Sequence, residues 1–212
     1  MVQIDTKTRL LDAAESLFSQ QGFANTSLRA ITTNAKANLA AVNYHFGSKE
    51  ALLRAVLERR LLPLNQQRSD NIDQVLAEAV TAGVTPDTEA LVRAFVEPTF
   101  SFRRNSTGSS EFISIVGRSM TSADPIVRDL FLALVQPLIN KLHQALCLSL
   151  PHLPSTLIFT RLFFTMGAMA HCICLSGPAQ IFIENLDPNP EDDDFMTNNL
   201  INFVTAGLEA SC

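Results

Sequence analysis

The chain has 212 residues, of which 47% are hydrophobic, and a formal net charge of −5. This is enough apolar material to bury a sizeable core in one domain or two, and the acidic balance excludes a protein that is basic over its whole surface. The charge is unevenly placed, because residues 1–60 hold eight Lys/Arg against five Asp/Glu, whereas the rest of the chain holds eight against sixteen. A basic N-terminal segment on an acidic body is typical of a nucleic-acid contact confined to one end.

Apolar residues recur mostly at helical spacing, and strand-like alternation and hairpin signals are few, so we expect an all-α fold. The cysteines show no metal-ligand spacing, and we see no signal peptide, so we expect reduced thiols, no metal, no cofactor and a cytoplasmic location. Residues 162–183 contain no Asp, Glu, Lys or Arg. Gly177-Pro178 is expected to end that helix too early for it to span a membrane.

Three helices are predicted in the first 46 residues. The first is an amphipathic helix over Thr8–Gln20, with Gly22 as its stop. Asn25-Thr26-Ser27 offers N-caps for the second, and Asn38 is the expected N-cap of a third, very short helix that ends at Gly47. Two helices of this size joined by a turn of about three or four residues have the dimensions of a helix-turn-helix.

Ser48 is predicted to cap a longer helix over residues 49–62, and Pro63 to break or kink the chain. We therefore divide the chain into domains 1–57 and 58–212. Asp124-Pro125 and Asp194 are further helix starts, and Pro137 is expected to bend the helix in which it lies. By periodicity the second domain holds five or six more helices, which we place at about 64–82, 87–102, 111–120, 125–150, 155–175 and 194–210. The polar stretch 103–110 and the acidic stretch 185–194 are expected to be loops.

The segment over residues 38–50 is the most informative part of the chain. A helix of about two turns buries too little to fold alone, so its neighbours must hold it. Small Ala40 and Ala41 leave one side open for close approach to a major groove, while Tyr44 and His45 place polar, planar groups at its end. Lys49 then adds a charge beside the positive end of the next helix. We interpret this arrangement as a DNA contact.

The same residues carry a resemblance to a known family. Arg9–Ala14, Leu17-Phe18, Gly22-Phe23, Thr26-Ser27, Ile31, Ala35 and Tyr44–Leu52 together resemble the N-terminal DNA-binding domain of TetR-type transcriptional regulators, over about residues 5–57. Residues 38–49 are also similar to the recognition segment of the PsrA-type, fatty-acid-responsive branch.

The resemblance implies an N-terminal three-helix domain with a helix-turn-helix and a C-terminal helical domain for effector binding and dimerisation. It implies a homodimeric regulator, in most cases a repressor, that leaves a palindromic operator in double-stranded DNA when a small hydrophobic effector binds. The last two helices of such proteins form the dimer interface. Residues 155–175 and 194–210 fit that role, because Gly167, Ala168 and Ala170 permit close packing and the first segment is too apolar for a solvent face.

Within this frame, Tyr44, His45 and Lys49 are expected to contact phosphates, and Leu39, Ala40 and Asn43 are left to contact bases. Two positions depart from the family. Lys36 stands where the family usually has Gly, in a turn that tends to need positive φ, and the family's usual Tyr falls at Asn43. The expected DNA-binding residues are Thr26, Ser27, Arg29, Lys36, Asn38, Leu39, Ala40, Ala41, Asn43, Tyr44, His45 and Lys49.

The branch resemblance implies that the effector is a long-chain fatty acid or acyl-CoA and that the regulated genes serve fatty-acid metabolism. Apolar walls would hold the chain, and one of several arginines (Arg103, Arg104, Arg118 or Arg161) would meet the acidic head. The candidate effector residues are Phe112, Arg118, Arg161, Phe163 and Met166.

Other interpretations stay open. The same fold would also suit a repressor of an efflux or stress operon that responds to an unrelated hydrophobic compound, or a pure interaction module. An enzyme is disfavoured, because paired carboxylates, a nucleophile elbow and a phosphate loop are all missing from the sequence. Residues 44–46 also fit a packing cluster, Arg118 and Arg161 also fit ion pairs, and His171 also fits a core or interface histidine.

Overall fold

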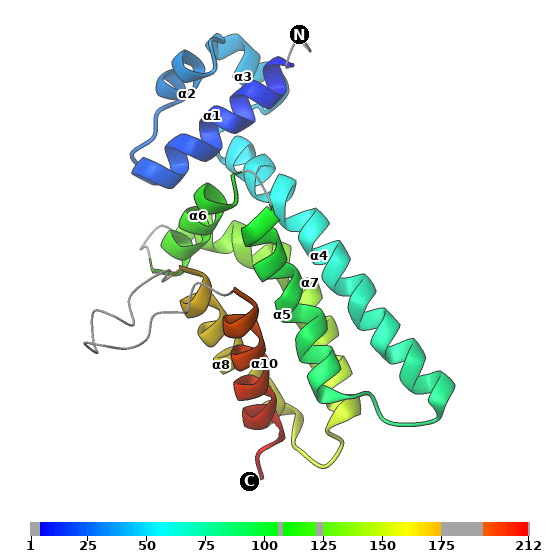
Figure 1. Cartoon of the computed structure of the whole chain (residues 1–212). Coiled ribbons are helices and arrows are strands. Elements are labelled where there is room, and N and C mark those ends of the chain that lie inside the picture. Colours follow the sequence, from blue (N-terminus) through cyan, green and yellow to red (C-terminus); the bar gives the residue numbers. More distant parts are fainter. Residues whose placement is uncertain (1–4, 106–107, 122–124, 175–192, 212) are drawn as a thin grey trace, which may run out of the picture. The chain divides into compact units, whose positions relative to one another are not determined.

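The computed structural model describes residues 5–105, 108–121, 125–174 and 193–211, and of residues 105, 118–121, 174 and 193 it describes the backbone alone. All regular structure in these ranges is helical, which confirms the predicted all-α class (Figure 1). Asp124 and residues 185–192 of the predicted acidic loop lie outside the described residues. The helices are α1 (Thr6–Gln21), α2 (Leu28–Asn34), α3 (Leu39–His45), α4 (Lys49–Ala82), α5 (Thr88–Asn105), α6 (Ser109–Thr121), α7 (Pro125–Ser149), α8 (Ser155–Cys174) and α10 (Asp193–Glu209).

The chain divides into two compact units, and each unit combines two segments of the sequence. The first unit comprises Met1–Pro63 and Thr107–Val135, and the second comprises Leu64–Ser106 and Gln136–Cys212. Helices α4 and α7 therefore each contribute residues to both units. The functional division at residue 57 stays a prediction.

Pro63 does not break the chain as predicted, because α4 runs through it as one helix of 34 residues. A proline inside a helix removes one backbone hydrogen bond. Pro63 is exposed, however, while Leu61 and Leu64 on either side of it are buried, so packing of the buried side holds the helix through this position. Residues 103–105, predicted as loop, likewise extend α5, and Asp194 lies in the first turn of α10 rather than at its N-cap.

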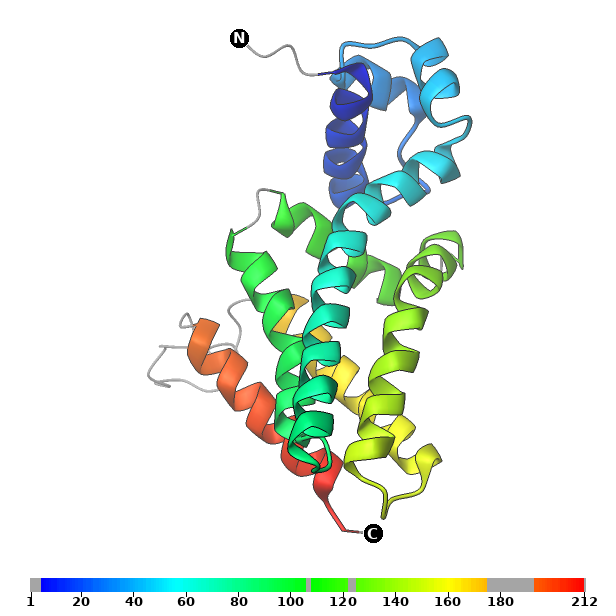
Figure 2. The same ribbon diagram turned by 90° about the vertical axis from the view of Figure 1, so that its right-hand side faces the viewer.

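The first unit is organised around α1. Leu10, Ala14 and Phe18 lie on its fully buried side, and the ring of Phe18 packs 5.5 Å from that of Phe23. Helices α2 and α3 pack against this side, and the three helices gather around the first turns of α4 (Figure 2). The predicted amphipathic stripe of the first helix is thus the core of the unit.

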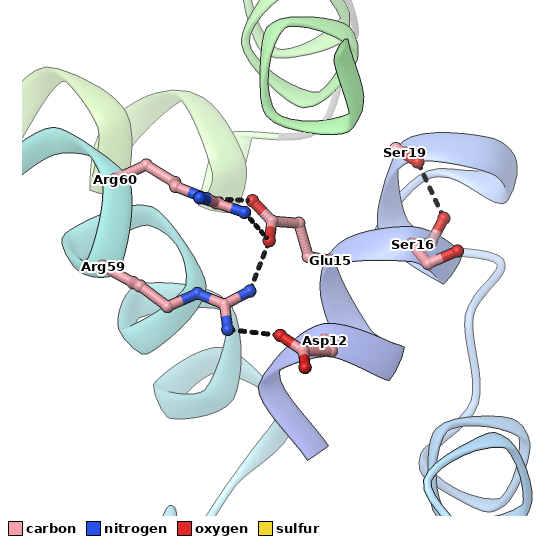
Figure 3. A network of polar contacts seen from close by, with 6 residues as sticks. All are labelled: Asp12, Glu15, Ser16, Ser19, Arg59 and Arg60. Carbon is pink, nitrogen blue, oxygen red and sulfur yellow. Dashed lines mark hydrogen bonds and ion pairs between the residues drawn. The ribbon is translucent and has the colours of Figure 1, made fainter. Parts of the chain in front are cut away.

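A buried carboxylate joins α1 to α4 (Figure 3). Glu15 is only 4% exposed, and its two oxygens accept hydrogen bonds from Arg60 Nε at 2.8 Å and Arg60 Nη2 at 2.9 Å. Arg59 donates to the same carboxylate through Nη2 and to Asp12 through Nη1 at 2.6 Å. The hydrogen bond from Arg60 to Glu15 raises the pKa of Arg60, which is the sign expected of a stabilising pair.

The start of α6 lies against the ion pair of Glu15 and Arg60. Gly108 precedes this helix with a φ of +80°, and a Cβ at that position would collide with the guanidinium of Arg60. The positive φ favours glycine here, and any larger residue would also have to push the Arg60 guanidinium aside. Further along α6, the Ser114 hydroxyl donates to the carbonyl of Ser19 on α1 at 3.2 Å.

The second unit contains α5, α8 and α10, with α10 lying against both of the others (Figures 1 and 2). Leu200, Ile201, Val204 and Leu208 of α10 are buried in this contact. By length and composition α8 is apolar enough to cross a membrane, a test that core helices of soluble proteins also pass. Only 22% of its most apolar window is buried within the chain.

Large apolar side chains therefore remain on the outside of α8 and α10. We call these five phenylalanines the phenylalanine face: Phe159, Phe163 and Phe164 on α8, with Phe195 and Phe203 on α10. Each is between 49% and 73% exposed. Several exposed aromatic side chains on two neighbouring helices suggest an interaction site.

We predict that Glu15→Gln lowers the free energy of unfolding by about 2 kcal/mol, because it leaves the partly buried Arg60 without its counter-charge and Arg59 with Asp12 alone. Asp12→Asn is the matched control, since Asp12 pairs with the same Arg59 but its side chain is 58% exposed. Its cost should stay below about 1 kcal/mol. Urea denaturation measures both, and equal losses in the two variants would contradict a dominant role for the buried carboxylate.

Candidate nucleic-acid interface

The connection between α1 and α2 is fixed by Thr26. This residue is 1% exposed, and its hydroxyl lies 2.8 Å from the carbonyl oxygen of Gly22 and 3.3 Å from that of Leu17. The hydroxyl is buried against backbone carbonyls and so stabilises this connection, while the DNA contact expected of Thr26 stays a prediction. Ser27 next to it is exposed and caps α2 by accepting from the Ala30 N–H at 3.1 Å. Arg29 is exposed in the first turn of that helix.

The turn between α2 and α3 requires a left-handed residue, and a lysine supplies it. Lys36 has a φ of +49°, the only positive φ of a non-glycine residue in the part of the chain that the structure describes. The conformation is held by hydrogen bonds from Lys36 N to the carbonyl of Thr33 and from Ala37 N to that of Thr32, at 3.2 and 2.9 Å. The cost of about 1 kcal/mol for a side chain in this region is therefore tolerated, and Lys36 is exposed.

Helix α3 has only seven residues and is capped at its start. The Asn38 side chain accepts from the Ala41 N–H at 2.9 Å, so this amide is occupied by capping. Val42 is completely buried and anchors the helix. The exposed residues follow at i, i+1, i+4 and i+5, and so form the opposite side of the helix, which consists of Leu39, Ala40, Asn43 and Tyr44. Ala41 is half-buried between the two sides.

The end of α3 and the start of α4 form one polar corner. Tyr44 is 86% exposed, which excludes the packing role that we considered for it. His45 is half-buried, and its ring lies between those of Tyr44 and Phe46, at centroid distances of 5.0 and 6.1 Å. The Lys49 ammonium lies 4.3 Å from the centre of the Phe23 ring, an arrangement that holds the charge at this corner.

Gly47 and Ser48 turn the chain from α3 into α4. Gly47 has a φ of +82°, and the Ser48 hydroxyl caps α4 by accepting from the Ala51 N–H at 3.1 Å. The backbone N–H of Glu50 and the hydroxyl of Ser48 lower the pKa of Glu50, which is the effect of a positive helix terminus on a carboxylate. The terminus that attracts Glu50 also attracts phosphate. Ser48 belongs to this corner but was expected only as a cap.

The candidate effector residues are divided between the two units. Phe112 is buried in the first unit, whereas Arg161, Phe163 and Met166 belong to the second unit. Arg161 donates to the Leu208 carbonyl at 2.8 Å, and Phe163 is 61% exposed on the phenylalanine face. The side chain of Arg118 lies outside the described residues.

Two other arginines considered for the acidic head have protein partners. Arg103 donates to the Cys172 carbonyl at 3.3 Å, and Arg104 forms an ion pair with Asp194.

One arginine of the second unit was not among the predicted residues. Arg68 is 5% exposed, and the signal that could have found it is its spacing from Leu64 and Ile72, which places it in the apolar stripe of α4.

Both the N-terminal and the C-terminal part of the chain match known protein families. Residues 10–56 match the family described as bacterial regulatory proteins, tetR family, and residues 93–207 match the tetracyclin repressor-like C-terminal domain. The HTH-type transcriptional regulator UidR of Escherichia coli strain K12 is 40% identical over 52 residues, which cover 24% of this chain and 26% of UidR. The HTH-type transcriptional repressor NicS of Pseudomonas putida is 41% identical over 61 residues, 29% of each chain. The chain thus spans little more than a quarter of the length of these relatives.

The similarity of fold extends further than the similarity of sequence. The crystal structure of the transcriptional regulator FadR from Bacillus subtilis, in complex with stearoyl-CoA, aligns with a TM-score of 0.68. The alignment covers 94% of this chain and 98% of that one at 12% identity, so it shows a common fold.

We predict that Tyr44→Phe lowers operator affinity roughly 5- to 10-fold, because it removes one phosphate hydrogen bond, and leaves stability unchanged because the hydroxyl is exposed. Thr26→Val is the converse control. It removes a buried hydroxyl from two carbonyls and should lower the free energy of unfolding by about 1–2 kcal/mol, with a smaller effect on affinity. Fluorescence anisotropy and urea denaturation separate the two, and an unchanged affinity of Tyr44→Phe would exclude a hydroxyl contact.

Proposed function

Because the chain belongs to the TetR family of bacterial transcription regulators, we propose that it is a homodimeric repressor that binds a palindromic operator through α2 and α3 and releases it when a fatty acid binds. Proteins of this family are transcription regulators rather than enzymes, bind DNA and small-molecule effectors, and act as dimers. We place the protein in the cytoplasm, where an operator is accessible.

The observation that carries the DNA-binding proposal is the exposed side of α3. Leu39, Ala40, Asn43 and Tyr44 lie on it together, while Val42 anchors the other side. Small Ala40 lets the helix approach base edges, Leu39 offers an apolar contact to thymine methyl groups, and Asn43 offers an amide to bases. Tyr44, Lys36, Lys49 and the N-terminus of α4 supply phosphate contacts around it.

A long-chain fatty acid or its acyl-CoA is the effector class that we propose. The fold is shared with FadR of Bacillus subtilis, whose structure contains stearoyl-CoA. The resemblance of residues 38–49 to the fatty-acid-responsive branch supports the same class. In this proposal the effector binds in the second unit and changes the spacing of the two recognition helices, which must match half-sites about 34–36 Å apart, or a multiple of that.

The phenylalanine face is the proposed dimer surface. Five exposed phenylalanines on α8 and α10 need cover in water, and a second copy with the same face supplies it in a symmetric, self-complementary contact. Gly167 lies on the same exposed side of α8, one turn after Phe163. Its lack of a side chain allows two helices to pack closely.

The effector proposal is tested by selecting genomic DNA fragments that the full-length protein binds, without ligand, with oleate and with oleoyl-CoA. We expect a palindromic site near genes of fatty-acid metabolism, with binding lost in one or both lipid arms. Octanol serves as the control for nonspecific apolar effects and should leave binding intact. Enriched sites that survive both lipids would contradict the effector class while leaving the DNA-binding function standing.

We predict that Gly167→Trp converts the dimer to a monomer and lowers operator affinity at least about 100-fold, because both half-sites are then no longer held by one particle. A Cβ at Gly167 meets nothing within 4 Å in the protomer, so the new side chain starts in open space. Light scattering gives the mass, and circular dichroism checks the fold. A Gly167→Trp protein that is still dimeric would place the interface elsewhere.

A further inference from the structure

Arg68 is a buried cation that pairs with no carboxylate of the residues that the structure describes. It lies between Leu64 and Ile72 in the apolar stripe of α4 and is 5% exposed. Among the described residues, no Asp or Glu oxygen lies within 4.0 Å of its guanidinium. This separates it from Arg59 and Arg60, whose guanidinium groups share the Glu15 carboxylate.

Neutral groups of α5 hold one side of the guanidinium. Its Nε donates to the Phe95 carbonyl at 2.9 Å, Nη2 donates to the Thr99 hydroxyl, and the Phe95 ring lies 4.5 Å from the central carbon. These contacts fix the orientation of the group. They solvate its hydrogen-bond donors without neutralising its charge.

The outer edge of the guanidinium, formed by Nη1 and Nη2, has weaker partners in addition to the Thr99 hydroxyl that Nη2 contacts. Nη1 lies 3.5 Å from the Asn65 amide oxygen, which is a long contact, and Nη2 lies 3.9 Å from the sulfur of Met169 on α8. A thioether is a weak acceptor, and methionine is the most adaptable apolar side chain. The edge that accepts a bidentate carboxylate is therefore the edge that a stronger acceptor could take over by moving Met169.

Burial without a counter-charge is energetically unfavourable for this arginine. It lowers the pKa of Arg68 to about 9, which leaves the group charged at neutral pH. An apolar side chain in the same stripe would avoid the desolvation penalty, as replacements of buried charges elsewhere show. An anion bound at the outer edge would pair with a guanidinium that is already desolvated and oriented. This pairing would offset the desolvation penalty of Arg68.

We propose that Arg68 is the site that binds the carboxylate of the effector, with the acyl chain displacing Met169 and running among the apolar side chains of the second unit. The inference rests on the proposed fatty-acid function and specifies its chemistry. A carboxylate is small enough to be buried with Arg68 and forms two parallel hydrogen bonds with a guanidinium. A thioester carbonyl is neutral, and the phosphates of CoA are too heavily hydrated for so buried a position, so the free acid is the preferred ligand.

The test measures the thermal stability and operator release of the full-length protein with oleate, oleyl alcohol and oleoyl-CoA, each below its aggregation concentration. For the wild type we expect oleate to bind about 10- to 100-fold tighter than oleyl alcohol, the range for a charge-assisted bidentate contact. Arg68→Met should lose that preference and bind both ligands alike. Arg93→Met is the matched control, since Arg93 on α5 carries the same charge on the surface, paired with Glu89 and Glu97.

The unliganded protein provides a second readout. Arg68→Met should keep or raise the Tm of the wild type, because it removes an unpaired buried charge. Arg68→Lys retains the charge without the bidentate geometry and should keep part of the preference for oleate. A clearly lower Tm in Arg68→Met would identify the guanidinium as a structural bridge between α4, α5 and α8 and would overturn the proposal.

The ligand outcomes separate this inference from the proposed function. If Arg68→Met binds oleate as tightly as the wild type, or if oleoyl-CoA binds the wild type tighter than oleate, the carboxylate site at Arg68 is excluded and a fatty-acyl effector still stands. If none of the three lipids affects the wild type, the fatty-acid function itself is excluded. Loss of the oleate preference in Arg93→Met as well would show a general charge effect and overturn the assignment to Arg68.

Discussion

A seven-residue helix cannot maintain its own structure in water, and the first unit is built to satisfy that constraint. Asn38 caps α3, Val42 anchors it, and α1 supplies the surface on which it rests. Glu15 then secures α1 to α4 through two guanidinium groups. Because Val42 and α1 hold α3 from one side, the opposite side of α3 is left for a partner.

The second consequence of this arrangement is a rigid corner between α3 and α4. Gly47 provides the positive φ, and Ser48 caps α4. The Lys49 ammonium packs over the Phe23 ring. A set of donors held in place before DNA arrives loses little conformational entropy on binding. Geometry of this kind suits phosphate contacts that set the position of a protein on DNA, while the neighbouring Asn43 and Leu39 remain available to bases.

Local patterns made much of this predictable from the sequence. The caps at Asn38 and Ser48 were predicted correctly, and the cap of α2 at Ser27 is one of the three residues predicted for it, because a cap depends on residues within three positions. Features that depend on packing against residues distant in the sequence were not predicted correctly. Pro63 reads as a break but lies on the exposed side of a continuous helix, and Thr26 reads as a polar cap but is buried against two carbonyls. The spacing of Arg68 from Leu64 and Ile72 places it in the apolar stripe of α4, but its partners on α5 and α8 come from distant parts of the chain.

The central claim is that two copies present α3 to the two halves of one operator, and hydroxyl-radical footprinting of the full-length protein on its operator tests it most directly. We expect two protected patches on one face of the duplex, related by a two-fold axis, with centres about 34–36 Å apart or a multiple of that. Protection should weaken steeply as salt rises, as expected for phosphate contacts. A single unsymmetrical patch, or protection that does not depend on salt, would contradict it.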